Sequence, residues 1–354
     1  MQNSESRKLY LIRHGSAGAD KRCISATDIP LDDFGEHQAK RLANWAADKN
    51  LTVYSSPLSR ALQTANALGA PVTICDELRE VNVGLWEGLA FDEIRSRYPE
   101  DFQKRGERPG TYPPTGGESI FEAGTRLLRC LSEIAGKTQG EIAVVAHGGI
   151  NRGALCRLLE KPPDEALLLP QPRGGISEIE VLPGGRMSVT SIGEMPDRYP
   201  DSRSTEWLRE RYKMPEHIRL HCNAVAQKAL QLAVGRNVDT ELLLCAAQLH
   251  DISRAHGFSH AQDGARLLRE SGYPRVSELI ACHHDLPDGT PLETQILYLA
   301  DKLVQGDREV SLHERFEESR KKCKSAEALA AWQRRFDAAV RVARELGLEV
   351  LSCE

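Results

Sequence analysis

The chain has 354 residues, of which 40% are hydrophobic and 27% charged, a composition that suits a globular protein of two domains. Its net charge of −5 argues against nucleic acid as an obligatory partner, because proteins that bind nucleic acid are usually basic. The cysteines include no C-x-x-C pair, the N-terminus is polar, and no apolar run is long enough to span a bilayer. We therefore expect a cytoplasmic protein without nucleic-acid or membrane partners, whose oligomeric state the sequence leaves open.

The first half of the chain alternates strand and helix signals. Runs rich in apolar residues at 8–12, 51–56 and 141–149 predict strands, and each precedes a segment with apolar residues at helical spacing. This alternation predicts an α/β domain with a mostly parallel sheet and helices on both faces. Apolar and polar residues alternate over residues 177–192 around Pro-Gly-Gly, which predicts a hairpin that closes the domain.

The second half shows no strand signal after Pro215. Residues 196–214 are polar and contain prolines, which predicts a linker with one short helix, and the later segments have helical periodicity. We therefore expect an α/β domain at residues 1–195 and an all-α domain at residues 215–318. Residues 319–354 should form a C-terminal helix that packs on the all-α domain, with dimerisation as the alternative.

Histidines, arginines and glycines gather where predicted strands end. Ligands of parallel sheets bind beyond the carboxyl ends of the strands, and glycines there let backbone amides approach an anion. One histidine, preceded by an arginine, stands at the end of the first run and another at the end of the third, and a second arginine stands on the first turns of the helix after the second run. The residues that we expect to converge on a phosphate are His14, His147, Arg13, Arg60, Gly15 and Gly148.

Such a pocket can perform nucleophilic chemistry on phosphorus. A neutral imidazole can attack a phosphate whose charge is neutralised, and arginines supply planar forks for the phosphoryl oxygens. A second histidine can stabilise the charge that develops during transfer. The leaving alcohol needs a proton, which a carboxylic acid such as Glu77, Glu80 or Glu87 could donate.

Five motifs support this interpretation. In chain order they are LIRHG, YSSPLSRALQTA, LREVNVGLWEG, PPTGGES and VVAHGG. Together they resemble the histidine phosphatase superfamily, the phosphoglycerate mutase-like clan, over residues 7 to about 195. The third motif resembles the phosphatase branch, which includes the α-ribazole phosphatases, more than the mutases.

The resemblance implies a role for each matching residue. It makes His14 the nucleophile, His147 the second pocket histidine, Glu80 the proton donor and the two arginines the phosphate ligands, with no cofactor. Glu87 looks like a structural companion rather than the acid. Many members carry Glu-Thr and an Asn after the Arg-His-Gly triplet, whereas residues 16–18 here are Ser-Ala-Gly, which leaves one phosphate contact unassigned.

The helical half carries histidines and aspartates inside otherwise apolar helices. Burying carboxylates without partners is costly, and a bound metal would offset that cost. Imidazole and carboxylate are ligands for Fe, Mn, Zn or Ni rather than calcium. The residues concerned are His221, His250, Asp251, His260, His283, His284 and Asp301.

The order of these residues resembles the HD-domain metal-dependent phosphohydrolases. The resemblance implies a first divalent transition metal held by His221, the His250–Asp251 pair and Asp301. The remaining histidines resemble those of the two-metal members, in which the aspartate of the pair bridges the ions, although His284 could be a neighbour and not a ligand. We therefore expect one or two metals. By their position beside these ligands, Arg254 and Lys302 could bind phosphate.

The two sites together predict a bifunctional phosphohydrolase. The first domain would be a phosphomonoesterase that acts through a phosphohistidine, and the second would hydrolyse another phosphoester with its metal. The substrate would be a small phosphorylated molecule, with a nucleotide-like compound as the first candidate. Two alternatives remain open: an HD domain that senses a nucleotide and regulates the phosphatase, and a mutase-like phosphotransferase.

Overall fold

The computed structural model describes residues 6–18, 22–256 and 260–348. The chain divides into two compact units. The first comprises Met1–Asp197 with Glu270–Gly272, and the second comprises Arg198–Arg269 with Tyr273–Glu354. Among the described helices, none combines the length and the apolar content that a membrane crossing requires.

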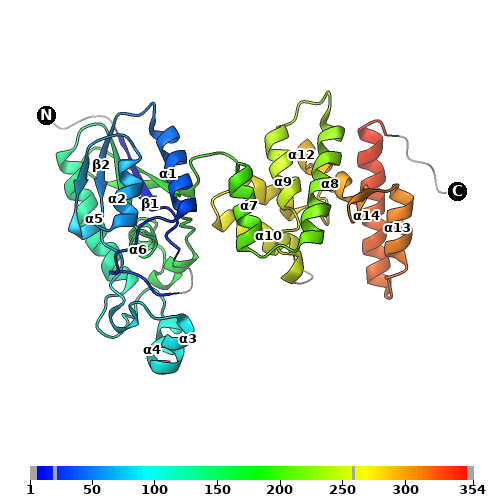
Figure 1. The fold of residues 1–354 in the computed structure, drawn as a ribbon. Helices are drawn as coiled ribbons and strands as arrows, with labels where there is room; N and C mark the ends of the chain where they lie inside the picture. Colours follow the sequence, from blue (N-terminus) through cyan, green and yellow to red (C-terminus); the bar gives the residue numbers. More distant parts are fainter. Residues whose placement is uncertain (1–5, 19–21, 257–259, 349–354) are drawn as a thin grey trace. The chain divides into compact units, whose positions relative to one another are not determined.

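The first unit is built on a six-stranded sheet with the order β3-β2-β4-β1-β5-β6 (Figure 1). The strands β3, β2, β4 and β1 run parallel, and β5 and β6 are antiparallel to their neighbours. This confirms the predicted mostly parallel sheet and the closing hairpin. The strands are β1 (Arg7–Arg13), β2 (Leu51–Ser55), β3 (Val72–Ile74), β4 (Glu141–Ala146), β5 (Ile176–Val181) and β6 (Met187–Glu194).

Helices cover both faces of this sheet, as predicted. Successive residues of β1 point to opposite faces, so Leu9 and Leu11 pack with α5 and α6 while Tyr10 and Ile12 pack on the side of α1 and α2. Because both faces are buried, the strand is a continuous apolar run without alternation. The helices are α1 (Asp33–Ala46), α2 (Ser59–Asn66), α3 (Phe91–Arg97), α4 (Pro99–Glu107), α5 (Ile120–Lys137) and α6 (Gly148–Leu158), with short 3₁₀ turns η1 (Asp76–Leu78), η2 (Gly84–Trp86) and η3 (Pro163–Leu168).

The second unit is helical, as predicted, apart from one short antiparallel pair of strands, β7 (Val304–Gln305) and β8 (Arg308–Glu309). Helix α8 packs against α9 and α12, and α14 packs against α12 and α13. The helices are α7 (Ser202–Arg211), α8 (Glu216–Ala233), α9 (Thr240–Leu249), α10 (His260–Glu270), α11 (Pro274–Ala281), α12 (Leu292–Lys302), α13 (Leu312–Arg320) and α14 (Ala326–Glu345), with the 3₁₀ turn η4 (Arg254–His256).

Helix α7 is the short helix predicted inside residues 196–214. One segment differs in detail from its expected outline, because residues 319–348 contain the end of α13 and all of α14 and not a single helix. Ser325 begins α14 by accepting a hydrogen bond from the Ala328 amide. Residues 349–354, the end of the expected C-terminal helix, lie outside the described residues.

Candidate functional site

Neighbouring strands bring the two expected pocket histidines together. β1 and β4 pair in parallel with Arg13 opposite Ala146, so the residues that follow each strand meet at the carboxyl edge of the sheet. The His14 amide donates to the Ala146 carbonyl at 3.1 Å, and the rings of His14 and His147 are 5.0 Å apart. Their exposed fractions are 6% and 0%, so both imidazoles lie in a water-poor environment.

The hydrogen bonding of His14 selects one tautomer. Its Nδ1 lies 2.7 Å from the Gly15 carbonyl oxygen, and because a carbonyl only accepts, Nδ1 must carry the proton. The lone pair is then on Nε2. Burial, followed by the charges of His147 and the two arginines, lowers the pKa of His14 well below its ordinary 6.5. His14 is therefore neutral near pH 7, which is the nucleophilic form of imidazole.

His147 is the second buried imidazole of the pocket. It stands at the N-cap of α6, and its Nε2 lies 2.8 Å from the Ser56 hydroxyl. Within the described part of the chain its Nδ1 forms no hydrogen bond. Burial and then the charges of Arg60 and Arg13 lower the pKa of His147 well below 6.5. Ser56 has no place in the sequence prediction, because nothing in its motif distinguishes it from a structural serine.

Arg60 is held rigidly at the start of α2. Its side chain is 2% exposed, and its Nη1 and Nη2 donate to the carbonyls of Thr27 and Ser25 at 2.9 and 2.8 Å. Arg13 is fixed from the other side of the site, where its Nη1 donates to the Gln171 carbonyl. Two preorganised guanidinium groups next to two neutral imidazoles form an environment for a dianionic phosphate.

Glu87 fixes the loop that holds Arg60. Its carboxylate accepts hydrogen bonds from the amides and hydroxyls of Ser25 and Thr27 and from the Ala26 amide. Burial alone would raise the pKa of Glu87, but the hydrogen bonds from Ser25 and Thr27 outweigh it and lower the pKa to about 2. Glu87 thus acts on the arginine through the loop, which is the structural role expected of it.

Glycines allow the pocket groups to approach the start of α6. A Cβ atom on Gly148 would lie 2.9 Å from Arg13 Nε, and one on Gly149 would lie 2.8 Å from Glu80 Oε1. Glu80 accepts hydrogen bonds from the amides of Gly149 and Ile150 at 3.1 and 2.9 Å. The carboxylate of Glu80, the expected proton donor, therefore lies against the N-terminus of α6, the helix whose N-cap is His147.

The loop after β1 contains the residues that depart from the family motif. Ser16 donates from its hydroxyl to Asp32 at 2.7 Å and accepts from Arg173 Nη1 at 3.1 Å. The charge of Arg173 also contributes to lowering the pKa of Arg60, after the larger effect of burial. Sequence reasoning missed Arg173, because it lies in an irregular loop before β5 and belongs to none of the motifs. Gly15 is required here, since a Cβ atom would lie 2.8 Å from the Gly35 carbonyl oxygen.

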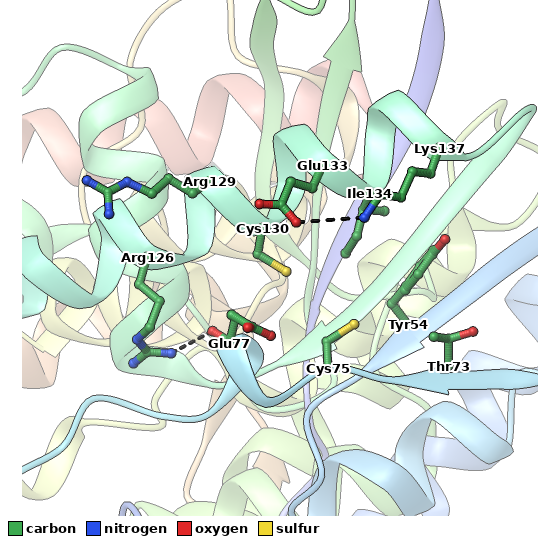
Figure 2. Close-up of a pocket in the computed structure, with 10 residues that line it drawn as sticks. All are labelled: Tyr54, Thr73, Cys75, Glu77, Arg126, Arg129, Cys130, Glu133, Ile134 and Lys137. Atoms are coloured by element: carbon green, nitrogen blue, oxygen red, sulfur yellow. Dashed lines mark hydrogen bonds and ion pairs between the residues drawn. The ribbon is translucent and has the colours of Figure 1, made fainter.

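A separate cavity of about 570 Å³ lies between α5 and the ends of β2 and β3 (Figure 2). Of the predicted site residues it contains one, Glu77, which was a candidate proton donor and lies away from the pocket of His14 and His147. Arg126, one of its lining residues, donates to the Arg79 carbonyl at 3.1 Å and to the Glu118 carboxylate at 2.6 Å. Helix α5 therefore fixes, through Arg126, the backbone that leads to Glu80, and the same arginine lines the cavity.

The second unit gathers the predicted histidines and aspartates at one place. Two groups of potential ligand atoms occur, each with its atoms within 4.8 Å of one another: His221, His250 and Asp251, and His260, His283 and His284. Asp251 connects them, because its Oδ1 lies 3.2 Å from His260 Nε2 and 3.5 Å from His283 Nε2. Asp301 completes the first group, 3.2 Å from His221 Nε2.

The histidines present their ligating nitrogens to the cluster. In three of them Nδ1 lies within hydrogen-bond distance of a backbone carbonyl, so Nδ1 carries the proton and Nε2 keeps its lone pair. The pairs are His221 with Gly306 (2.8 Å), His250 with Ala247 (2.9 Å) and His283 with Ile280 (2.6 Å). This tautomer is the one that a metal requires.

Several polar atoms of the cluster have no hydrogen-bond partner among the described residues. They are buried and point at one another: His250 Nε2, His283 Nε2 and Asp251 Oδ1. Burial would raise the pKa of Asp251, but its interactions with the neighbouring histidines, His250 first, outweigh burial and lower it, so the carboxylate is ionised. Unpartnered nitrogen lone pairs facing buried carboxylates are costly without a cation. The residues therefore fit a transition-metal centre.

Two cations contact the carboxylates of this cluster. Arg254 Nη1 forms an ion pair with Asp251 Oδ2, and Lys302 Nζ lies 2.6 Å from Asp301 Oδ2. Lys302 also donates to the His283 carbonyl at 3.1 Å. Phosphate binding by these two residues stays a prediction.

Comparison with known proteins agrees with the division of the chain. The model of the histidine phosphatase superfamily (branch 1) matches residues 9–192, and that of the HD domain matches residues 219–305. The chain is 32% identical over 162 residues to 6-phosphofructo-2-kinase/fructose-2,6-bisphosphatase 1 of Rattus norvegicus, and 30% identical over 162 residues to the Gallus gallus enzyme. The match to the rat protein covers 45% of this chain but 34% of that relative, about a third of its length.

Solved structures match the first unit. Bacillus stearothermophilus YhfR is 31% identical with a TM-score of 0.50, and the match covers 53% of this chain and 96% of that one. The α-ribazole phosphatase from Shigella flexneri is 25% identical with a TM-score of 0.48, with coverage of 53% and 96%.

Proposed function

Because the chain belongs to the histidine phosphatase superfamily and carries an HD domain, we propose that it is a bifunctional phosphohydrolase. Residues 1–195 would form the phosphomonoesterase, and residues 215–318 would form the metal-dependent phosphoester hydrolase. The observation that carries the proposal is that each unit brings together residues suited to phosphate ester hydrolysis. One has a neutral imidazole beside the buried Arg60 and the partly buried Arg13, and the other has histidine nitrogens and carboxylates converging at one place.

In the first site, His14 Nε2 attacks phosphorus and forms a P–N bond while the P–O bond to the substrate alcohol breaks. Arg13 and Arg60 bind the phosphoryl oxygens, and His147 stabilises the charge that develops on them. Glu80 donates a proton to the leaving alkoxide. In the second half-reaction, Glu80 takes a proton from water as the water attacks the phosphohistidine, which releases inorganic phosphate and restores His14.

In the second site, the proposed metal ligands are the histidines and aspartates of the cluster. One or two divalent transition metals, Fe, Mn, Zn or Ni, would polarise a phosphoryl oxygen and activate water there when bound. The protein's own part is to hold the ligands with Nε2 facing inward and to keep the site dry. Arg254 and Lys302 add positive charge beside the carboxylates, which would favour a phosphorylated substrate.

The substrate would be a small phosphorylated molecule. The curated relatives from rat and chicken carry fructose-2,6-bisphosphatase in their names, and that name denotes hydrolysis of a small phosphate ester. Two hydrolytic sites on one chain suit successive steps, in which a nucleotide-like compound is trimmed to a monophosphate and then to an alcohol. A cytoplasmic location, which the unpatterned cysteines favour, is part of this proposal.

The test separates the two activities in the full chain. Hydrolysis of an aryl phosphate and an aryl phosphodiester is measured with and without chelator in wild type, His14→Ala and Asp251→Ala. We expect His14→Ala to abolish the chelator-resistant monoesterase and Asp251→Ala to abolish the chelator-sensitive diesterase. His217→Ala is the control, because this exposed histidine lies on α8 close to His221 but outside the cluster.

Either of two results would reject the two-site proposal. One is a folded single variant that loses both activities. The other is a wild-type protein whose phosphatase rate responds to a nucleotide that it does not consume, which would make the HD domain a sensor.

A further inference from the structure

The segment between α11 and α12 carries two of the proposed ligands, His283 and His284. It is irregular between residues 282 and 291, so regular helical hydrogen bonding does not fix its backbone. Two side chains do. Lys302 Nζ donates to the His283 carbonyl at 3.1 Å. On the other side of His284, Arg335 of α14 binds the Asp285 carboxylate through Nε and Nη2, at 2.7 and 2.9 Å.

His284 needs such support more than the other ligands do. It is half-buried, whereas His283 is 1% exposed. Its Nε2 lies 2.7 Å from His260 Nε2, so a small shift of the backbone would move it out of line with the second group. The two attachments on either side of His284 restrict that shift.

Helix α14 is itself fixed to the helix that carries Asp301. The Tyr298 hydroxyl of α12 donates to the Arg335 carbonyl at 2.6 Å, and the Tyr298 side chain is fully buried. The ammonium group of Lys302 lies 4.8 Å from the Tyr298 ring centre. The backbone of Arg335 is therefore anchored to α12, and its side chain reaches back to the histidine segment.

The geometry of the Arg335–Asp285 pair suits positioning better than stabilisation. Both side chains are partly exposed, at 37% and 68%, and exposed ion pairs contribute little to the free energy of unfolding. Two parallel N–H···O bonds, by contrast, fix direction as well as distance. The arginine lies outside residues 219–305, the part that matches the HD domain, so it is a feature of this chain's C-terminal extension.

We propose that Arg335 is a positioning residue for a second metal ion, acting through Asp285 on His284. The inference rests on the two-metal form of the function proposed for the second unit. Loss of the arginine would free one side of the histidine segment and weaken the second site, while the first group, on α8, α9 and α12, would keep its geometry.

The test is a titration of the chelator-treated full chain with Mn²⁺, followed by calorimetry and by metal analysis. For wild type we expect two sites. For Arg335→Gln we expect the second site to weaken by about tenfold, a typical effect of losing support around a ligand, while the first is unchanged. Asp285→Asn, which removes the carboxylate charge at nearly constant size, should give the same result.

The matched control is Arg341→Gln. Arg341 lies on the same helix and forms a 3.6 Å ion pair with the fully exposed Asp288 of the same segment, and a second ion pair of 3.7 Å with Glu345. It should bind Mn²⁺ as wild type does. Two sites of unchanged affinity in folded Arg335→Gln would overturn the inference alone. A single site in wild type would overturn the two-metal proposal and this inference with it.

Discussion

Replacement of Glu87 by Gln tests whether a carboxylate outside the pocket stabilises the α/β unit and orients Arg60 in the pocket. In the protein, hydrogen bonds from Ser25 and Thr27 lower the Glu87 pKa from an ordinary 4.5 to about 2, against the opposing effect of burial. A shift of that size corresponds to roughly 3 kcal/mol of preference for the ionised form. Because the side chain is partly exposed, solvent screening reduces this to about 1–2 kcal/mol of folding free energy.

The sign of the pH dependence follows from the lowered pKa. The contribution of Glu87 is fully present above the unfolded pKa, about 4.5, and is lost as the pH falls toward about 2. The free energy of unfolding of wild type should therefore fall by this amount across that pH window. Glu87→Gln should already have a lower free energy of unfolding at neutral pH and should not lose this contribution on acidification. Calorimetry measures the unfolding transitions of the two variants. The transition whose Tm rises when inorganic phosphate is added belongs to the α/β unit. Glu133→Gln, a change at an exposed side chain, is the control.

The same substitution should also weaken phosphate binding. The loop that Glu87 holds supplies the two carbonyls that orient Arg60, so we expect KM for an aryl phosphate to rise about tenfold, the value of roughly one hydrogen bond. If Glu87→Gln and wild type lose stability in parallel between pH 4.5 and 2, with equal KM values, the carboxylate does not act as described.

Other consequences can be measured directly. Gly149→Ala places a methyl group 2.8 Å from the Glu80 carboxylate, so kcat for an alkyl phosphate should fall about 100-fold in steady-state assays, whereas Gly136→Ala on α5, with nothing within 4 Å, should leave kcat unchanged. Equal kcat values would mean that Glu80 is not the acid. Because the pKa of His14 lies well below 6.5, the nucleophile is already neutral there, and a pH–rate profile should show no fall in kcat/KM near pH 6.5; a fall there would assign the nucleophile a normal pKa. Removal of metal by chelator should lower Tm for the helical unit and leave the transition of the α/β unit in place, since the buried carboxylates lose their counter-ion; an unchanged Tm would indicate that no metal was bound.

The strands and helices were predictable wherever burial left a pattern in the sequence. β1 and β4 are buried on both faces and form apolar runs, and the amphipathic helices repeat at 3.6 residues. β3 (Val72–Ile74) was not predicted, because it has three residues and two of them are exposed. The β7–β8 pair was missed for a similar reason, since a two-residue strand carries no periodicity.

The pocket residues that lie at the ends of strands could be predicted from the sequence. His14 and His147 stand at the ends of apolar runs and beside glycines, a combination that favours a ligand site over a purely structural role. A buried aspartate in an apolar helix likewise indicates a ligand. The supporting contacts had no such signal. Arg173 reaches Ser16 from a loop distant in the chain, and Arg335 reaches Asp285 on the surface, so neither interrupts a hydrophobic pattern.

The position of β1 at the centre of the sheet has a consequence for synthesis of the chain. Its two neighbours, β4 and β5, come much later in the sequence, so β1 leaves the ribosome long before either partner exists. Until then its apolar side chains, fully buried in the finished protein, face water, and its backbone groups are unpaired. Closing such long loops is slow, which exposes the nascent chain to aggregation and favours chaperone binding at this strand. The proposed nucleophile His14 is thus translated long before β4 and β5, and it gains its surroundings only after both strands have emerged.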